Sequence, residues 1–238
     1  MTKAFGGILL FLLSWLASAE TFSIGGRSLE IPPPKGFVVV TPAMDAMYRW
    51  IKQVNYPENE LLAYYIPETE APVAMRGDLV TTSRYCLLQV NRQAKSTTVS
   101  HRDFADIRRA IRSQYTEISA SSKRKVKEPM EKAAENLSQE FGIDFSTRVS
   151  QDTPLAPHYE TENIIASSSY TSYRDSIDGK IEERITSGTD AVINLEGKVL
   201  FLYCFGAAAD LDWTRSASKV WTEMITAANA DPLRDSPK

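Results

Sequence analysis

The residues that could take part in chemistry are few and far apart in the sequence. The chain has two histidines, His101 and His158, and neither belongs to an HExxH or CxxC spacing of the kind that holds a metal ion. No GxSxG motif marks a nucleophilic serine, and no glycine-rich phosphate loop occurs. We therefore expect no metal site and no cofactor. The missing motifs favour a protein without catalytic activity, although residues from distant parts of the chain could still converge into a catalytic site.

Binding chemistry is indicated most clearly between residues 163 and 175, in the run NIIASSSYTSYRD. Small hydroxyl side chains alternate there with tyrosines, and such a strand can both stack on a partner and hydrogen-bond to it. We predict a binding surface at Tyr170, Tyr173 and Arg174. The alternative interpretation is an exposed sheet face made of good strand formers.

His158 is the remaining candidate site residue. It lies in the stretch 152–158, which contains two prolines and is expected to be a loop. In a hydrolase with dispersed acid and base residues, His158 would need a carboxylate within about 3 Å in a concave pocket.

The two cysteines, Cys86 and Cys204, each lie in an apolar, strand-like run, RYCLLQV and FLYCFG. An even number of cysteines in an exported chain indicates a disulfide, whereas the alternative is two separate buried thiols. A bridge requires the two Cα atoms to lie within about 7 Å of each other. Neither cysteine has the exposed, electropositive setting that a nucleophile needs.

The N-terminus has the three parts of a secretory signal peptide. Lys3 is followed by an apolar run from Ala4 to Leu16 and by the small residues Ala17-Ser18-Ala19. The run is shorter than the roughly 20 apolar residues of a membrane span. We expect residues 1–19 to be cleaved, which leaves a soluble, periplasmic or secreted chain without a transmembrane segment.

The composition bounds the partners. The formal net charge is −3, which steers the chain to no particular partner and argues against nucleic acid as a ligand. The partner that we expect is another exported or envelope protein. The remaining residues, 20–238, are enough for one domain with a sizeable core. We expect that domain to end in a flexible polar tail at about 231–238.

Two stretches near the C-terminus determine the expected fold. The run Val199 to Phe205 is apolar on both faces, which is typical of a central strand covered on both sides, and the preceding Leu195-Glu196-Gly197 predicts a hairpin turn. Residues 212–228 carry a wide apolar stripe at helical spacing. Ser100 and Asp103 form a helix-capping pattern at the start of a helical layer over about 100–142. The expected class is α+β, an antiparallel β-sheet sandwiched by helices with a long C-terminal helix packed on the sheet.

This order of elements resembles the PsbP-like and DcrB-like superfamily of exported α/β domains. The resemblance is carried by LEIPPPKGF at 29–37, by the meander over 181–206 with its EGK turn, and by the closing helix at 212–228. It implies a non-enzymatic accessory, chaperone or binding domain, and it carries over no catalytic residue.

The sequence therefore predicts an exported soluble binding or accessory protein that acts through a protein-binding or ligand-binding surface. Two alternatives stay open. One is the hydrolase with dispersed acid and base residues described above. The other is an immunity protein or an inhibitor of a secreted toxin, which export, size and a disulfide would suit.

Overall fold

The computed structural model describes residues 19–53 and 58–230, apart from the side chains of residues 122–126. Residues 1–18 of the predicted signal peptide, which spans 1–19, lie outside the described residues, and so does the predicted flexible tail. The described chain starts with a small hairpin of β1 (Glu20–Ile24) and β2 (Arg27–Ile31), joined by the Gly25-Gly26 turn. None of the described helices has a stretch long and apolar enough to cross a membrane.

The main sheet of the described chain has seven antiparallel strands in the order β3-β4-β5-β9-β8-β7-β6. The strands are β3 (Phe37–Val39), β4 (Asn59–Pro67), β5 (Tyr85–Asn91), β6 (Phe145–Glu160), β7 (Ile164–Ile177), β8 (Lys180–Leu195) and β9 (Lys198–Ala207). The apolar strand β9 is the fourth of the seven, so the prediction of a central strand is confirmed. Its Leu195-Glu196-Gly197 turn has both Glu196 and Gly197 at positive φ, as a tight hairpin requires.

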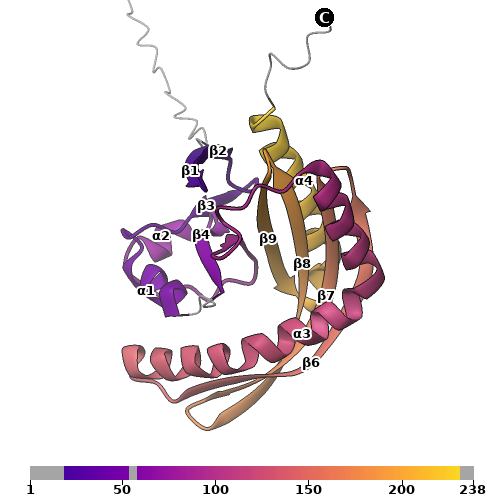
Figure 1. The fold of residues 1–238 in the computed structure, drawn as a ribbon. Helices are drawn as coiled ribbons and strands as arrows, with labels where there is room; N and C mark the ends of the chain where they lie inside the picture. Colours follow the sequence, from indigo (N-terminus) through magenta and orange to yellow (C-terminus); the bar gives the residue numbers. More distant parts are fainter. Residues whose placement is uncertain (1–18, 54–57, 231–238) are drawn as a thin grey trace, which may run out of the picture.

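One face of the sheet is covered by α4 (Leu211–Ala228), which follows a short 3-10 turn, η1 (Ala208–Asp210) (Figure 1). Trp221 and Ile225 of α4 are fully buried in the core on this face. The Trp221 indole donates a hydrogen bond to the Pro32 carbonyl at 2.8 Å, which ties the helix to the segment after β2. The α+β class and the C-terminal helix packed on the sheet are therefore confirmed.

The disulfide between Cys86 and Cys204 lies in the same core. The two residues are direct partners in the β5–β9 ladder, and their Cα atoms are 4.2 Å apart. Both are fully buried. The predicted bridge is confirmed, and it links strands that are distant in the sequence but adjacent in the sheet.

The opposite face of the sheet is enclosed by α1 (Asp45–Gln53) and α3 (His101–Phe141), and Ala74 of the short helix α2 (Ala71–Ala74) is buried in one cluster with Met47 and Ile51 of α1. The predicted Ser100–Asp103 capping box begins α3, and Gly142 at φ 66° ends it. Gln114 departs from helical geometry. Figure 1 shows α3 bending along β6 and ending near α1. Arg49 of α1 forms a salt bridge with Glu140, which joins the two helices.

The expectation of a loop over 152–158 is wrong, because these residues belong to β6. This strand is at the edge of the sheet and has no neighbour on its outer side in the described chain. On an edge strand every second N–H points away from the sheet, and a proline at such a position removes no ladder hydrogen bond, so an edge strand is where prolines such as Pro154 and Pro157 are tolerated. Pro157 also lies where the β6–β7 register shifts, between Leu155 and Tyr159.

Candidate functional site

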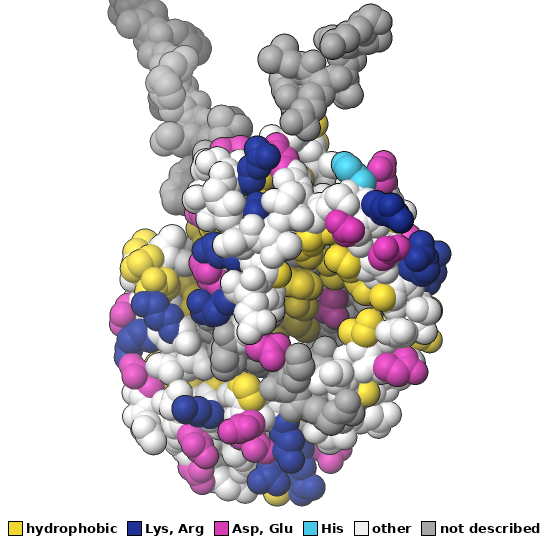
Figure 2. Space-filling model, viewed as in Figure 1, with side chains coloured by type: hydrophobic (Ala, Val, Ile, Leu, Met, Phe, Trp, Pro, Cys, Tyr) yellow, Lys and Arg dark blue, Asp and Glu magenta, His cyan; other side chains and the backbone are white. Residues whose placement is uncertain are grey.

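Strand alternation divides the side chains of the main sheet between a closed core and a cavity. On β9, Leu202 and Cys204 are fully buried against α4, whereas Tyr203 and Phe205 point to the other face and are half-buried. On that second face, α1 and α3 do not pack tightly onto the strands. A cavity of about 640 Å³ remains between them, which we name the central cavity. Figure 2 shows this hollowed face, with hydrophobic side chains lining it.

The walls of the central cavity come from elements spread over most of the described chain. The helices contribute Trp50 of α1 and Ser119 and Met130 of α3. The sheet contributes Tyr64 of β4, Tyr85 of β5, Asp152 of β6, Ser167, Ser169, Thr171 and Tyr173 of β7, Asp190 of β8, and Tyr203 and Phe205 of β9. Most of the other lining side chains are aliphatic. The cavity therefore has a mainly aliphatic and aromatic lining with acidic, amide and hydroxyl groups set into it, and such a combination suits a site for a small molecule.

Aromatic rings form a continuous row on the sheet side of the cavity. Tyr64 stacks on Tyr85 with ring centroids 5.2 Å apart, Tyr85 on Phe205 at 5.0 Å, and Phe205 on Tyr203 at 6.2 Å. Trp50 of α1 meets Tyr64 edge to face at 6.1 Å. Because each ring is held by its neighbours, the row gives the cavity a rigid wall.

Gly188 makes room for one of these rings. It is the direct ladder partner of Phe205, and a Cβ at this position would lie 2.9 Å from a ring carbon of Phe205. Contacts that short force one of the two groups to move. The absence of a side chain on Gly188 thus lets the Phe205 ring lie over β8, two residues from Asp190.

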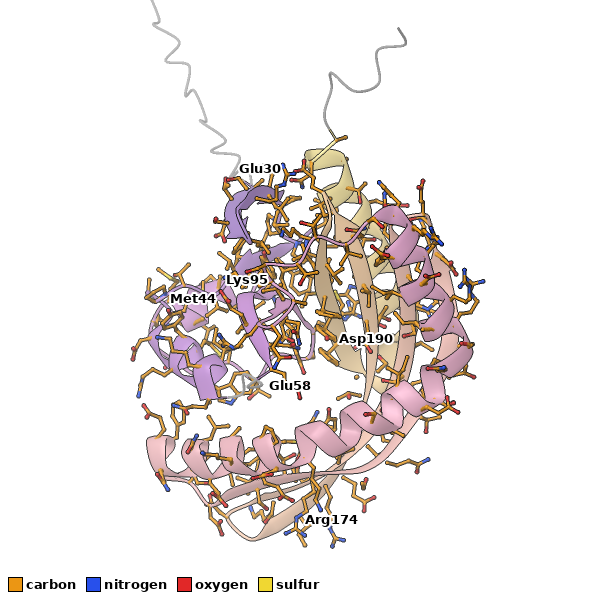
Figure 3. The ribbon with its side chains drawn as sticks, viewed as in Figure 1. Glu30, Met44, Glu58, Lys95, Arg174 and Asp190 are labelled. Carbon is orange, nitrogen blue, oxygen red and sulfur yellow. A yellow bond between two sulfur atoms is a disulfide. The ribbon has the colours of Figure 1, made fainter. Side chains whose placement is uncertain are left out.

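Asp190 is a carboxylate in this aromatic setting. It is half-buried, and its direct partners in the sheet are Tyr203 on β9 and Ser167 on β7. No hydrogen bond or salt bridge joins its carboxylate to another side chain among the described residues. Burial raises the pKa of Asp190 to about 7, and the negative charge of Asp152 acts in the same direction. Figure 3 shows Asp190 beside β8, on the side facing α3.

Asp152 has a different environment from Asp190. Its carboxylate accepts one hydrogen bond from the Ser119 hydroxyl of α3 and another from the Thr171 hydroxyl of β7, at 2.9 Å. Together with Glu58, these two aspartates are the charged side chains among the described residues that line the cavity, and all three are acids. The described residues contain no cluster of three or more His, Cys, Asp or Glu side chains that could hold a metal ion.

The predicted surface at Tyr170, Tyr173 and Arg174 is divided between two faces of the sheet. Tyr173 lines the central cavity and has the Arg184 guanidinium over its ring at 4.4 Å. Burial raises the pKa of Tyr173. Tyr170 and Arg174 point to the opposite face, because neighbours at odd spacing in a strand alternate. The structure therefore brings one of the three residues to the candidate site.

His158 does not line the cavity. It is exposed on the α4 side, where its Nδ1 lies 3.5 Å from the Ser168 hydroxyl. Burial of the ring atoms and the positive charge of Arg215 lower the pKa of His158. No carboxylate among the described residues hydrogen-bonds to it, so the pocket required by the hydrolase hypothesis is not found there.

The Ser168 hydroxyl itself belongs to a buried polar network. Arg215 donates to it at 3.3 Å, and it is hydrogen-bonded to Thr189 at 2.9 Å, which in turn contacts Thr214 at 2.8 Å. These bonds connect β7, β8 and α4. They satisfy polar groups under the helix and so account for Ser168 structurally.

Sequence reasoning missed Asp152 and Asp190. The available signal was the position of Asp190 in TDAVINL, a carboxylate within an apolar run next to the predicted central strand. Such a residue is buried if the neighbouring strand covers it. Asp152 offered no comparable signal, since the prolines around it indicated a loop.

Comparisons with known proteins give a limited result. No protein-family model matches the chain, and no curated protein matches it. Solved structures that are similar to it include the following two. One is the solution structure of cyanobacterial PsbP (CyanoP) from Synechocystis sp. PCC 6803, at 11% identity and a TM-score of 0.28, covering 95% of this chain and 96% of that one. The other is the Ran-binding protein Mog1p of Saccharomyces cerevisiae, at 9% identity and a TM-score of 0.29, covering 89% and 93%.

The similarity to CyanoP agrees with the PsbP-like resemblance of the sequence only as a distant likeness of fold. Both TM-scores are below 0.5, and neither likeness extends to function.

Proposed function

We propose that this protein is a binding protein that holds an apolar or amphipathic small molecule in the central cavity. The observation that carries the proposal is a cavity of about 640 Å³ with a rigid aromatic wall and a mainly apolar lining. Pockets for small molecules have volumes of roughly 300–1,000 Å³ and a mostly apolar lining. Ligand binding is also the chemistry that best fits a site without a histidine or a cysteine among its described lining residues.

The proposal includes export, to a periplasm or to the cell exterior. A disulfide that crosses the centre of the sheet supports an oxidising compartment, where such bonds form and persist. The proposed mature chain is a single domain over 20–238. Action on another exported or envelope protein, as an accessory protein or inhibitor, is compatible with a ligand-filled cavity.

The proposal can be tested with N-phenyl-1-naphthylamine, an uncharged probe whose fluorescence rises in apolar surroundings. Ser169 and Ser172 form a matched pair on β7, because Ser169 lines the cavity and Ser172 points to the opposite face. We expect saturable binding to the wild-type protein. Ser169→Phe should weaken this binding at least about tenfold by filling the cavity, and Ser172→Phe should leave it within about twofold.

Thermal unfolding followed by circular dichroism shows whether each variant is folded. If the wild-type protein does not bind the probe, or if Ser172→Phe weakens binding as much as Ser169→Phe, the central cavity is not the binding site and the proposal is wrong.

A further inference from the structure

We propose that the ligand of the central cavity is a cationic amphiphile, an ammonium group on an apolar chain or ring, with Asp190 as the counter-ion of the ammonium group. This inference rests on the proposed function and names the class of ligand that the cavity takes. Three observations support it: the charges that line the cavity, the carboxylate of Asp190 without a described partner, and the aromatic rings beside that carboxylate.

The described residues that line the cavity carry a single sign of charge. The charged side chains among its described lining residues are Glu58, Asp152 and Asp190, and Figure 3 shows Glu58 and Asp190 on different sides of the enclosed space. Carboxylates in a cavity with low-dielectric walls concentrate cations and repel anions. A fatty acid or another anionic lipid would therefore be disfavoured, although the apolar walls suit its chain.

Asp190 lacks the partner that a buried carboxylate normally has. Its neighbour Asp152 accepts two hydroxyl hydrogen bonds, whereas Asp190 accepts none from the described side chains. A half-buried, unpaired carboxylate is costly, and a cation at hydrogen-bonding distance offsets that cost. The position of a ligand cation is thus defined by Asp190, a carboxylate that accepts no hydrogen bond from the described side chains.

The rings next to Asp190 suit an ammonium group. Tyr203 is the direct ladder partner of Asp190, and the ring of Phe205 lies over Gly188, two residues along the same strand. A cation over the face of an aromatic ring is attracted by the ring's electron density, most strongly where water is excluded. Carboxylate and rings would therefore hold the same group from two sides, while the chain of the ligand extends along the apolar wall.

The test compares octylammonium with n-octanol, which has the same chain and no charge. Each compound displaces N-phenyl-1-naphthylamine from the wild-type protein at pH 8, where most of the Asp190 carboxyl is ionised, in buffer with about 150 mM salt to screen the surface charge. We expect octylammonium to displace the probe at a concentration lower by about tenfold or more, since charge-assisted hydrogen bonds are the stronger ones.

Asp190→Asn is the decisive variant, because it keeps the shape of the side chain and removes its charge. It should reduce the preference for octylammonium over n-octanol to about threefold or less. Asp212→Asn, an exposed aspartate on α4, makes the same change in net charge and should keep the full preference.

The outcomes distinguish this inference from the proposed function. If the probe binds but octylammonium shows no preference, or if Asp190→Asn retains the preference, the cationic ligand class is wrong and the binding function stands. If the uncharged probe does not bind the wild-type protein, the proposed function itself is wrong.

Discussion

Asp190 on β8 and Tyr203 on β9 are direct partners in an antiparallel ladder, and both side chains line the central cavity. The ladder therefore holds a carboxylate beside the aromatic wall, where few groups can solvate its charge. The pKa of Asp190 is raised to about 7 as a result. This one pairing connects the fold, the stability and the proposed ligand of the protein.

The raised pKa predicts how stability depends on pH. The pKa of Asp190 rises from 3.8 to about 7 on folding, so between these values the folded chain holds a proton that the unfolded chain has released. Stability from this group is highest below about pH 4, declines as the pH rises to about 7, and is constant above. The decline is at most about 4 kcal/mol, and water in the cavity should reduce it to about 2 kcal/mol.

Asp190→Asn removes this decline, so its stability should match that of the wild-type protein near pH 4 and exceed it at pH 8. Urea unfolding at several pH values measures the difference. The groups that face Asp190, including Asp152 and Tyr203, are present in both proteins and cancel in the comparison. If the difference in free energy of unfolding between Asp190→Asn and the wild-type protein is the same at pH 4 and at pH 8, the raised pKa is contradicted.

Reduction of the Cys86–Cys204 disulfide should destabilise the protein strongly. The bond joins residues 118 positions apart, and cross-linking so long a loop removes conformational freedom from the unfolded chain. We expect the free energy of unfolding to fall by about 4 kcal/mol in Cys86→Ser/Cys204→Ser. Denaturant unfolding with and without a reductant measures this. The reductant should affect the wild-type protein alone, and an equal response of the double variant would show that the bond is not the cause.

Gly188→Ala should destabilise the protein by about 1–3 kcal/mol, because the added methyl group lies within 3 Å of the Phe205 ring. The ring cannot move freely, since it is stacked on Tyr85 and Tyr203. Phe205→Leu in the same chain relieves the contact, so the second change should cost less stability in the Gly188→Ala background than in the wild-type protein. Thermal unfolding of the wild-type protein, the two single variants and the double variant gives a double-mutant cycle. Additive effects on stability would show that the two side chains do not compete for space.

Tyr170 and Tyr173 provide a test of which face of β7 binds a ligand. Tyr173→Ala removes part of the cavity lining, whereas Tyr170→Ala changes the opposite face of the same strand. We expect the first variant to weaken binding of N-phenyl-1-naphthylamine about threefold to tenfold and the second to leave it unchanged. If Tyr170→Ala weakens binding and Tyr173→Ala does not, the binding surface is on the outer face of β7. An accessory protein that contacts a partner through Tyr170 and Arg174 would have such a surface.

The sequence by itself determined the central strand, the C-terminal helix, the start of α3 and the disulfide, because the signals of these features are local. Apolar residues on both faces of Val199–Phe205 identified the central strand, the stripe in 212–228 identified α4, and Ser100 with Asp103 identified the start of α3. The two cysteines, each in an apolar strand, indicated the disulfide. These features depend on residues a few positions apart, or on a single pair, so periodicity and composition were enough.

The tertiary structure alone decided which side chains form the site. Asp152, Asp190 and Tyr203 come from three strands, and their proximity depends on the strand order and on the register of each ladder. Register also placed Tyr173 in the cavity and Tyr170 outside it. The edge position of β6 made its prolines compatible with a strand where the sequence indicated a loop. Strand order and register result from packing over the whole chain, and for this reason the sequence determined the elements with local signals while the tertiary structure decided the edge strand β6 and the cavity.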